Sequence, residues 1–120
     1  TSQLSCVLVS SIYGLVGTAA NCGYAMSKAS LHGLTKALSV ELASKNIRVN
    51  CIAPGFIKTT MMDKNIEYFD NNYIDLLNNL HPLGLGNPLD IAYGILYLLS
   101  KASKWITGII LPIDGGYTAK

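Results

Sequence analysis

Three segments of the chain have the pattern of buried β-strands. Residues 6–9 form a continuous apolar run, which is typical of a strand buried on both faces of a parallel sheet. Residues 47–52 form a second candidate and residues 108–113 a third. Pro112 cannot donate a backbone hydrogen bond, so we expect the third strand to lie at an edge of the sheet.

Two long helices are predicted between these strands. Leucines recur at three- and four-residue steps between residues 24 and 44, which is the spacing of an amphipathic helix. Asn87 as the N-cap and Pro88 at the first helical position open a second helix that should run to about Ser100. Between the two, over residues 56–80, the periodicity fades and leaves room for one short helix. The alternation predicts an α/β layered fold whose first strand–helix–strand unit crosses over right-handedly.

The composition suits one ordinary domain and excludes several classes of protein. Half of the 120 residues are hydrophobic and 13% are charged, so the chain can bury a substantial core. The net charge is +2 and the basic residues are scattered, which argues against a nucleic-acid partner. No apolar run approaches the roughly 20 residues of a membrane span. We therefore expect a cytoplasmic protein.

The cysteines and histidines show no arrangement typical of a metal site. Cys6, Cys22 and Cys51 lack metal-ligand spacing, and reduced thiols are expected. His32 and His81 have no evident partner along the chain, which predicts solvated or core imidazoles.

The most informative feature is Tyr24 followed four residues later by Lys28, with Ser11 thirteen residues upstream. Residues four apart share a helix face. A lysine ammonium about 4 Å from a phenol interacts with it by roughly 4 kcal/mol at an effective dielectric of about 20. This corresponds to about three pKa units, enough to bring a tyrosine from about 10 into the range of acid–base catalysis. Ser11 would supply a second hydroxyl to hold a substrate oxygen.

Tyr97 and Lys101 repeat the same spacing. Chance alone supplies about half a match of this kind in a chain of this composition. Because Tyr97 lies within the apolar run 95–99, we expect it to pack in a buried helix face rather than to catalyse.

Together these residues resemble the catalytic half of the short-chain dehydrogenase/reductase family, over essentially the whole chain. The matching segments follow in the family's order: Val9–Ser11, Tyr24–Lys28, Asn46–Gly55, Thr59, Ile106–Gly108 and Ile113–Gly116. The overall pattern looks like the branch of the 3-oxoacyl-acyl-carrier-protein reductases and tropinone-reductase-like enzymes.

The resemblance implies a doubly wound, Rossmann-like parallel sheet that binds NADP or NAD. It implies hydride transfer between the nicotinamide and a carbonyl or secondary-alcohol carbon of a small molecule. Tyr24 would be the acid/base and would also contact the cofactor. Lys28 would bind the nicotinamide ribose and lower the tyrosine pKa, and Ser11 would hold the substrate oxygen.

The resemblance also implies a nicotinamide-binding segment at Pro54, Gly55, Ile57 and Thr59. The backbone of Ile57 and the Thr59 hydroxyl would meet the carboxamide. Residues 61–80 would form the variable segment that covers the substrate. Its apolar residues fit a hydrophobic ketone or packing on their own domain equally well: Ile66, Tyr68, Phe69, Tyr73, Ile74, Leu76 and Leu77.

No Gly-rich phosphate turn of a dinucleotide fold is found in the sequence. We therefore expect residues 1–120 to be the C-terminal, catalytic half of such a domain, without the N-terminal dinucleotide-binding half. The reductase resemblance favours NADP, although the residues that choose between NADP and NAD would lie upstream of Thr1.

Two functions remain open. The chain is either the catalytic half of an oxidoreductase that forms a homo-oligomer as a complete subunit, or a truncated, catalytically silent relative acting as an association module. The set Ser11, Tyr24, Lys28 and Thr59 favours the first function. The missing cofactor half favours the second for the isolated chain, whose own activity we expect to be negligible.

Overall fold

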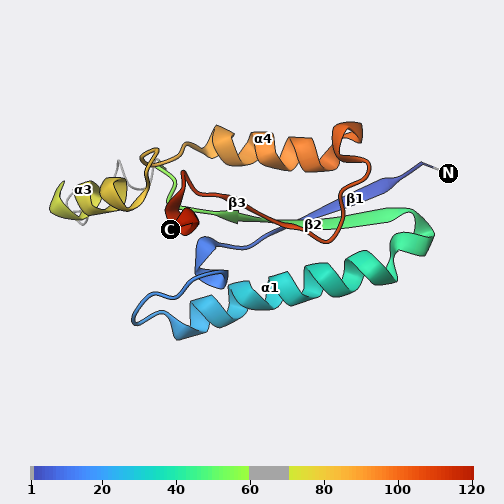
Figure 1. The fold of residues 1–120 in the computed structure, drawn as a ribbon, viewed down its shortest axis with the longest axis horizontal. Helices are drawn as coiled ribbons and strands as arrows, with labels where there is room; N and C mark the ends of the chain where they lie inside the picture. The colour runs from blue at the N-terminus through green and yellow to red at the C-terminus, as the bar shows by residue number, and fades with distance from the viewer. Residues whose placement is uncertain (1, 60–70) are drawn as a thin grey trace.

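The structure, a computed structural model, describes residues 2–59 and 71–120. Three parallel strands lie side by side in chain order: β1 (Leu4–Val9), β2 (Ile47–Pro54) and β3 (Ile110–Ile113). Helix α1 (Cys22–Glu41) covers one face of this sheet and α4 (Pro88–Leu99) covers the other (Figure 1). These three layers confirm the expected α/β fold, in a body of 52 × 27 × 26 Å.

The central strand β2 forms the core of the molecule. All of its residues from Arg48 to Ala53 are buried, and its register aligns Leu4 with Ile47 and Cys51 with Ile110. The prediction for β1 was wrong in one respect, because this strand is not buried on both faces. Leu4 and Val9 are largely exposed, since β1 is an edge strand in the described part of the chain.

Helix α1 begins two residues before the predicted start and ends three residues earlier. A 3₁₀ turn, Ala43–Lys45, replaces its predicted last turn. Asn46 then adopts the left-handed conformation with φ 57°, which asparagine tolerates better than most residues. This turn directs the chain back into β2.

The connection from β2 to β3 is long and includes a second, short helix, α3 (Asn71–Leu80), as the fading periodicity allowed. Helix α4 then starts as predicted, with the Asp90 carboxylate accepting a hydrogen bond from the Asn87 amide at 2.7 Å. Both connections step in the same direction across the sheet, yet α1 and α4 lie on opposite faces (Figure 1). The two crossovers therefore have opposite hands, and one departs from the right-handed rule.

Arg48 links β2 to the end of α4. Its buried guanidinium donates to the carbonyl oxygens of Leu98, Ser100 and Ile106 and to the side chain of Gln3. The last carbonyls of a helix carry partial negative charge, so this cation stabilises the C-terminal end of α4.

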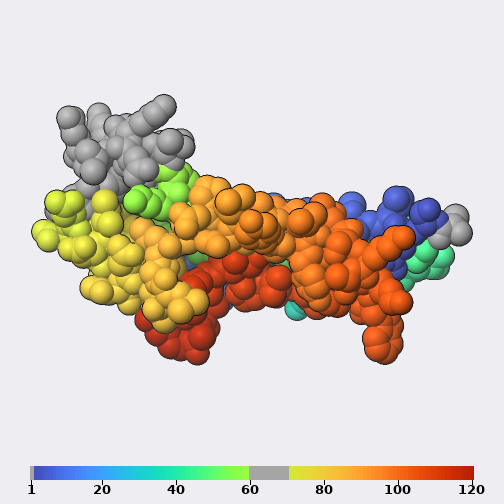
Figure 2. Space-filling model, turned by 90° about the horizontal axis from the view of Figure 1, so that it is seen from above, coloured from blue at the N-terminus to red at the C-terminus, as the bar shows by residue number. Residues whose placement is uncertain are grey.

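The apolar residues 95–99 of α4 are more exposed than the sequence predicts. Figure 2 looks down on the outer surface of this helix, which is drawn in orange along the middle of the molecule. Of the apolar run 95–99 only Leu98 is fully buried, and Tyr97 is 43% exposed. The expectation that Tyr97 packs inside a buried face was therefore wrong, because much of this run faces away from the sheet.

Candidate active site

A cavity of about 340 Å³ opens at the carboxyl ends of β1 and β2. This is the edge at which open α/β sheets bind their ligands. The lining residues come from the loop after β1, the start of α1 and the loop after β2: Ser11, Ile12, Tyr13, Asn21, Tyr24, Pro54, Gly55, Phe56 and Ile57. Five residues predicted from the sequence, Ser11, Tyr24, Pro54, Gly55 and Ile57, are thus brought to one site.

Ser11 stands where β1 gives way to a 3₁₀ turn, Ile12–Gly14. It is 7% exposed, and its Oγ accepts a hydrogen bond from the Tyr13 amide at 3.1 Å. An amide can only donate, so this bond occupies a lone pair of Oγ and not its hydrogen. Among the described residues no acceptor for the Ser11 hydroxyl hydrogen is seen, which leaves it able to donate toward the cavity.

Tyr24 and Lys28 share one face of α1, as their spacing predicts. The Lys28 Nζ lies 5.6 Å from the centroid of the Tyr24 ring, within the range of a cation–π contact. The same Nζ is 3.5 Å from the carbonyl oxygen of Val9, at the end of β1. Lys28 therefore lies close to Tyr24 and to the end of β1 but is not among the residues that line the cavity.

The loop after β2 is held by a short backbone bridge to Gly86. The Lys58 amide donates to the Gly86 carbonyl at 2.8 Å, and the Gly86 amide donates to the Phe56 carbonyl at 3.2 Å. In extended chain, adjacent residues direct their backbone groups to opposite sides. The amide and carbonyl of Ile57 consequently face away from Gly86. Thr59 follows this bridge and does not line the cavity.

Gly55 is required by close packing in this loop. A Cβ on Gly55 would lie 2.9 Å from the Asp114 Cα and 3.0 Å from the His81 ring. Any other residue at this position would displace the loop that lines the cavity.

An aromatic cluster that sequence reasoning missed borders the cavity. Tyr13, Phe56, His81 and Tyr117 contact one another, mostly edge to face, with ring centroids 4.9–6.3 Å apart. Burial raises the pKa of Tyr13 to about 12, and the hydrogen bond and charge of Tyr117 add to this shift. Tyr13 is therefore a neutral wall of the cavity at physiological pH. The four residues follow different elements, so no local spacing pointed to them.

His32, for which the sequence showed no evident partner, is partly buried and hydrogen-bonded in the fold. It lies one turn beyond Lys28 on α1, and its Nε2 is hydrogen-bonded to the Ser10 hydroxyl. Burial lowers the pKa of His32, a backbone hydrogen bond with Gly14 opposes this shift, and the charge of Lys36 adds to it. His32 thus ties α1 to the end of β1, beside Ser11.

Other kinds of site find no support in the described part of the chain. Residues 2–59 and 71–120 contain no cluster of His, Cys, Asp or Glu that could hold a metal ion. None of the described helices has both the length and the apolar character needed to cross a bilayer. All three cysteines are free thiols, and Cys51 alone is buried.

The geometry defines a parallel-sheet α/β protein with its site at the carboxyl strand ends, and comparisons with known proteins identify the family. The family profile described as "Enoyl-(Acyl carrier protein) reductase" matches residues 1–118. The 3-oxoacyl-[acyl-carrier-protein] reductase FabG of Chlamydia muridarum is 47% identical over 111 residues, which are 92% of this chain and 43% of that protein. A tropinone reductase homolog of Arabidopsis thaliana is 36% identical, over 95% of this chain and 43% of that protein.

A solved structure agrees with the sequence matches. The structure of ElxO with NADP bound superimposes with a TM-score of 0.89 at 40% identity, covering 97% of this chain and 47% of that one. The chain belongs to the short-chain dehydrogenase/reductase family. It spans less than half the length of these relatives.

Proposed function

We propose that this chain is the catalytic half of an NAD(P)-dependent oxidoreductase acting on a carbonyl or secondary alcohol. The observation that carries the proposal is that Ser11 and Tyr24 line the same cavity as Pro54–Ile57, with the Lys28 Nζ 5.6 Å from the centroid of the Tyr24 ring. Such a site offers hydroxyls for a substrate oxygen and backbone groups for a cofactor.

We assign roles to the three polar side chains from the family resemblance, and their positions in the structure are compatible with these roles. In the reducing direction, the Tyr24 hydroxyl gives its proton to the substrate oxygen while the carbonyl carbon receives a hydride. The Ser11 hydroxyl donates a hydrogen bond to the same oxygen and holds it in place. A cation beside a phenol stabilises the phenolate that remains, which is the role we assign to Lys28. Oxidation of an alcohol runs through the same groups in reverse.

The loop after β2 fits the nicotinamide end of a dinucleotide, which supplies the hydride when bound. A carboxamide has one acceptor and two donor hydrogens, and the Ile57 backbone offers one amide and one carbonyl on the side away from Gly86. We propose that Pro54, Gly55 and Ile57 bind this end, and that the Thr59 hydroxyl joins them. The reductase resemblance alone favours NADP over NAD.

The second candidate function, a catalytically silent association module, is compatible with the exposed apolar side chains on both helices. Met26 and Val40 on α1 and Leu89 and Leu96 on α4 are each more than half exposed. These faces suit contacts with other subunits, and they would serve equally in an enzyme or in a silent association module.

An assay on a complete subunit containing residues 1–120 separates these functions. We expect oxidation of NADPH or NADH in the presence of apolar ketones or 3-oxoacyl thioesters. Reduction of small hydrophilic sugars in preference to these would contradict the proposed apolar substrate. A folded, cofactor-bound subunit that turns over no carbonyl or alcohol would favour the association module.

A further inference from the structure

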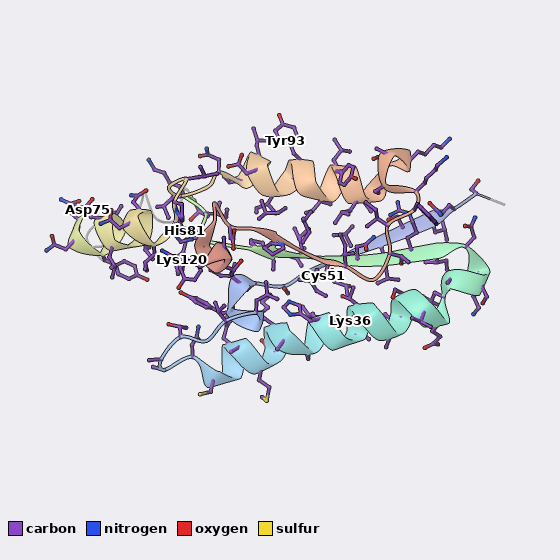
Figure 3. The ribbon with its side chains drawn as sticks, in the orientation of Figure 1. Lys36, Cys51, Asp75, His81, Tyr93 and Lys120 are labelled. Carbon is purple, nitrogen blue, oxygen red and sulfur yellow. The ribbon has the colours of Figure 1, made fainter. Side chains whose placement is uncertain are left out.

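His81 joins three segments of the chain beside the cavity. It follows directly after α3 and lies beside the C-terminal turn, where its ring centroid is 4.9 Å from that of Tyr117 (Figure 3). Only 2% of its surface is exposed. Its Nδ1 is 2.6 Å from the Leu77 carbonyl oxygen, and its Nε2 is 3.1 Å from the Phe56 amide nitrogen. The ring therefore connects α3 to the loop after β2.

The two partners determine which ring nitrogen carries the hydrogen. A carbonyl can only accept a hydrogen bond and an amide N–H can only donate one. The ring in this arrangement is therefore neutral, with the hydrogen on Nδ1 and the lone pair on Nε2. That lone pair is the acceptor of the Phe56 amide.

The Phe56 amide lies in the segment that carries the Ile57 backbone. The neighbouring hydrogen bonds of this segment join backbone groups. The Gly55 amide donates to the Ile113 carbonyl at 2.9 Å, and the Lys58 amide donates to the Gly86 carbonyl at 2.8 Å. The amide of Phe56, by contrast, is held by a side chain. The placement of Ile57 thus depends on the residue at position 81.

The close fit around Gly55 strengthens this dependence. A Cβ there would lie 3.0 Å from the His81 Nε2, so the ring packs closely against Gly55 as well as bonding to the next residue, Phe56. A shift of the ring would move the loop with it.

We propose that His81 is a positioning residue for the nicotinamide end of the cofactor. Through the Phe56 amide it holds the backbone groups of Ile57 where the carboxamide binds. This inference rests on the proposed function and adds to it a residue outside the cavity lining.

Two substitutions separate the hydrogen bond to Phe56 from the rest of the side chain. In His81→Gln the longer amide side chain reaches about as far as Nε2 and restores an acceptor. In His81→Asn the shorter amide occupies the Nδ1 position and stops short of Phe56. Titration of NADPH into a complete subunit containing residues 1–120 should give a Kd about ten-fold higher for His81→Asn, because a buried amide loses its acceptor. His81→Gln should stay within about two-fold of the unmodified subunit.

Asn78→Ala is the matched control. The Asn78 side chain accepts from the Leu85 amide at 3.3 Å and donates to the Ile74 carbonyl at 3.2 Å, at the same end of α3. Loss of these contacts loosens α3 without removing a partner of Phe56. We expect Asn78→Ala to bind NADPH with the Kd of the unmodified subunit.

The outcomes distinguish this inference from the proposed function. His81→Asn binding NADPH as tightly as the unmodified subunit would overturn the positioning role, and so would equal weakening by Asn78→Ala. If His81→Asn does not fold, weakened binding by a folded His81→Gln would overturn it, and unchanged binding would support it. An unmodified subunit that neither binds NADPH nor reduces a carbonyl would instead contradict the proposed function.

Discussion

At the residue scale, Ser11 combines a structural and a chemical role in one side chain. Its oxygen accepts from the Tyr13 amide and caps the 3₁₀ turn after β1, while its hydroxyl hydrogen remains for a substrate. The cap uses the hydroxyl oxygen and the proposed substrate contact uses the hydroxyl hydrogen. The two roles can therefore be separated by comparing Ser11 with a serine that only caps a turn.

Ser11→Ala should lower kcat while leaving the Kd for NADPH nearly unchanged, because the partner of the hydroxyl hydrogen is the substrate oxygen. Steady-state kinetics and cofactor titration on a complete subunit would measure both quantities. Ser100→Ala is the control, since Ser100 likewise caps a 3₁₀ turn by accepting from the Ala102 amide at 3.3 Å. Both variants should lose about 1 kcal/mol of stability from the lost cap. An equal loss of kcat in both would assign the effect to folding instead of chemistry.

At the element scale, two side chains on one face of α1 form hydrogen bonds with the end of β1. Lys28 reaches the Val9 carbonyl, and His32, one turn later, bonds to the Ser10 hydroxyl. These contacts fix the distance between the helix that carries Tyr24 and the loop that carries Ser11. The second contact also makes the junction sensitive to pH.

Because of His32, the free energy of unfolding should decrease as the pH falls below about 6.5. Its pKa is lowered in the folded state from the ordinary 6.5, chiefly by burial, so the unfolded chain takes up the proton first. The contribution of neutral His32 to the free energy of unfolding is complete above pH 6.5. It declines as the pH falls toward the lowered pKa that His32 has in the folded state. Urea denaturation between pH 8 and pH 5 would show it as a pH-dependent loss of stability.

His32→Gln is the matching variant, because its amide can still bond to Ser10 but does not titrate. The loss of stability between pH 8 and pH 5 should be smaller in this variant. An identical pH dependence in the two proteins would show that other groups are responsible.

The elements and the centre of the site could be predicted from the sequence because both depend on local patterns. Ser11 and Tyr24 meet because a strand end and a helix start lie at one edge of a parallel sheet. The His81–Phe56 hydrogen bond could not be predicted, since it joins two residues 25 positions apart across a stretch of sequence without clear periodicity. The exposure of Val9 was missed for a related reason, because apolar character does not reveal which strand lies at an edge.

At the scale of the whole molecule, the described part of the chain exposes large apolar side chains on its edge strand and on its helices. Leu4 and Val9 lie on the edge strand β1, and Met26 and Val40 lie on the outside of α1. The described sheet has three strands, and the chain spans 43% of the FabG relative. An exposed edge strand with apolar side chains pairs readily with other chains.

The 120-residue chain expressed alone should therefore self-associate or unfold, and bind dinucleotide poorly. It contains the proposed nicotinamide-side residues without a Gly-rich phosphate turn in its sequence. Size-exclusion chromatography with light scattering, together with NADPH titration, would measure both properties. A monodisperse monomer that melts cooperatively and binds NADPH with micromolar affinity would contradict this expectation.

The assignment of Tyr24 as the acid/base is tested most directly by comparing two tyrosines with the same lysine spacing. In a complete subunit, Tyr24→Phe keeps the ring and removes the transferable proton, so kcat should fall by about 10²- to 10⁴-fold or more. Tyr97→Phe makes the same chemical change on α4, outside the cavity lining, and should leave kcat nearly unchanged. Loss of turnover in Tyr97→Phe with full turnover in Tyr24→Phe would contradict the account.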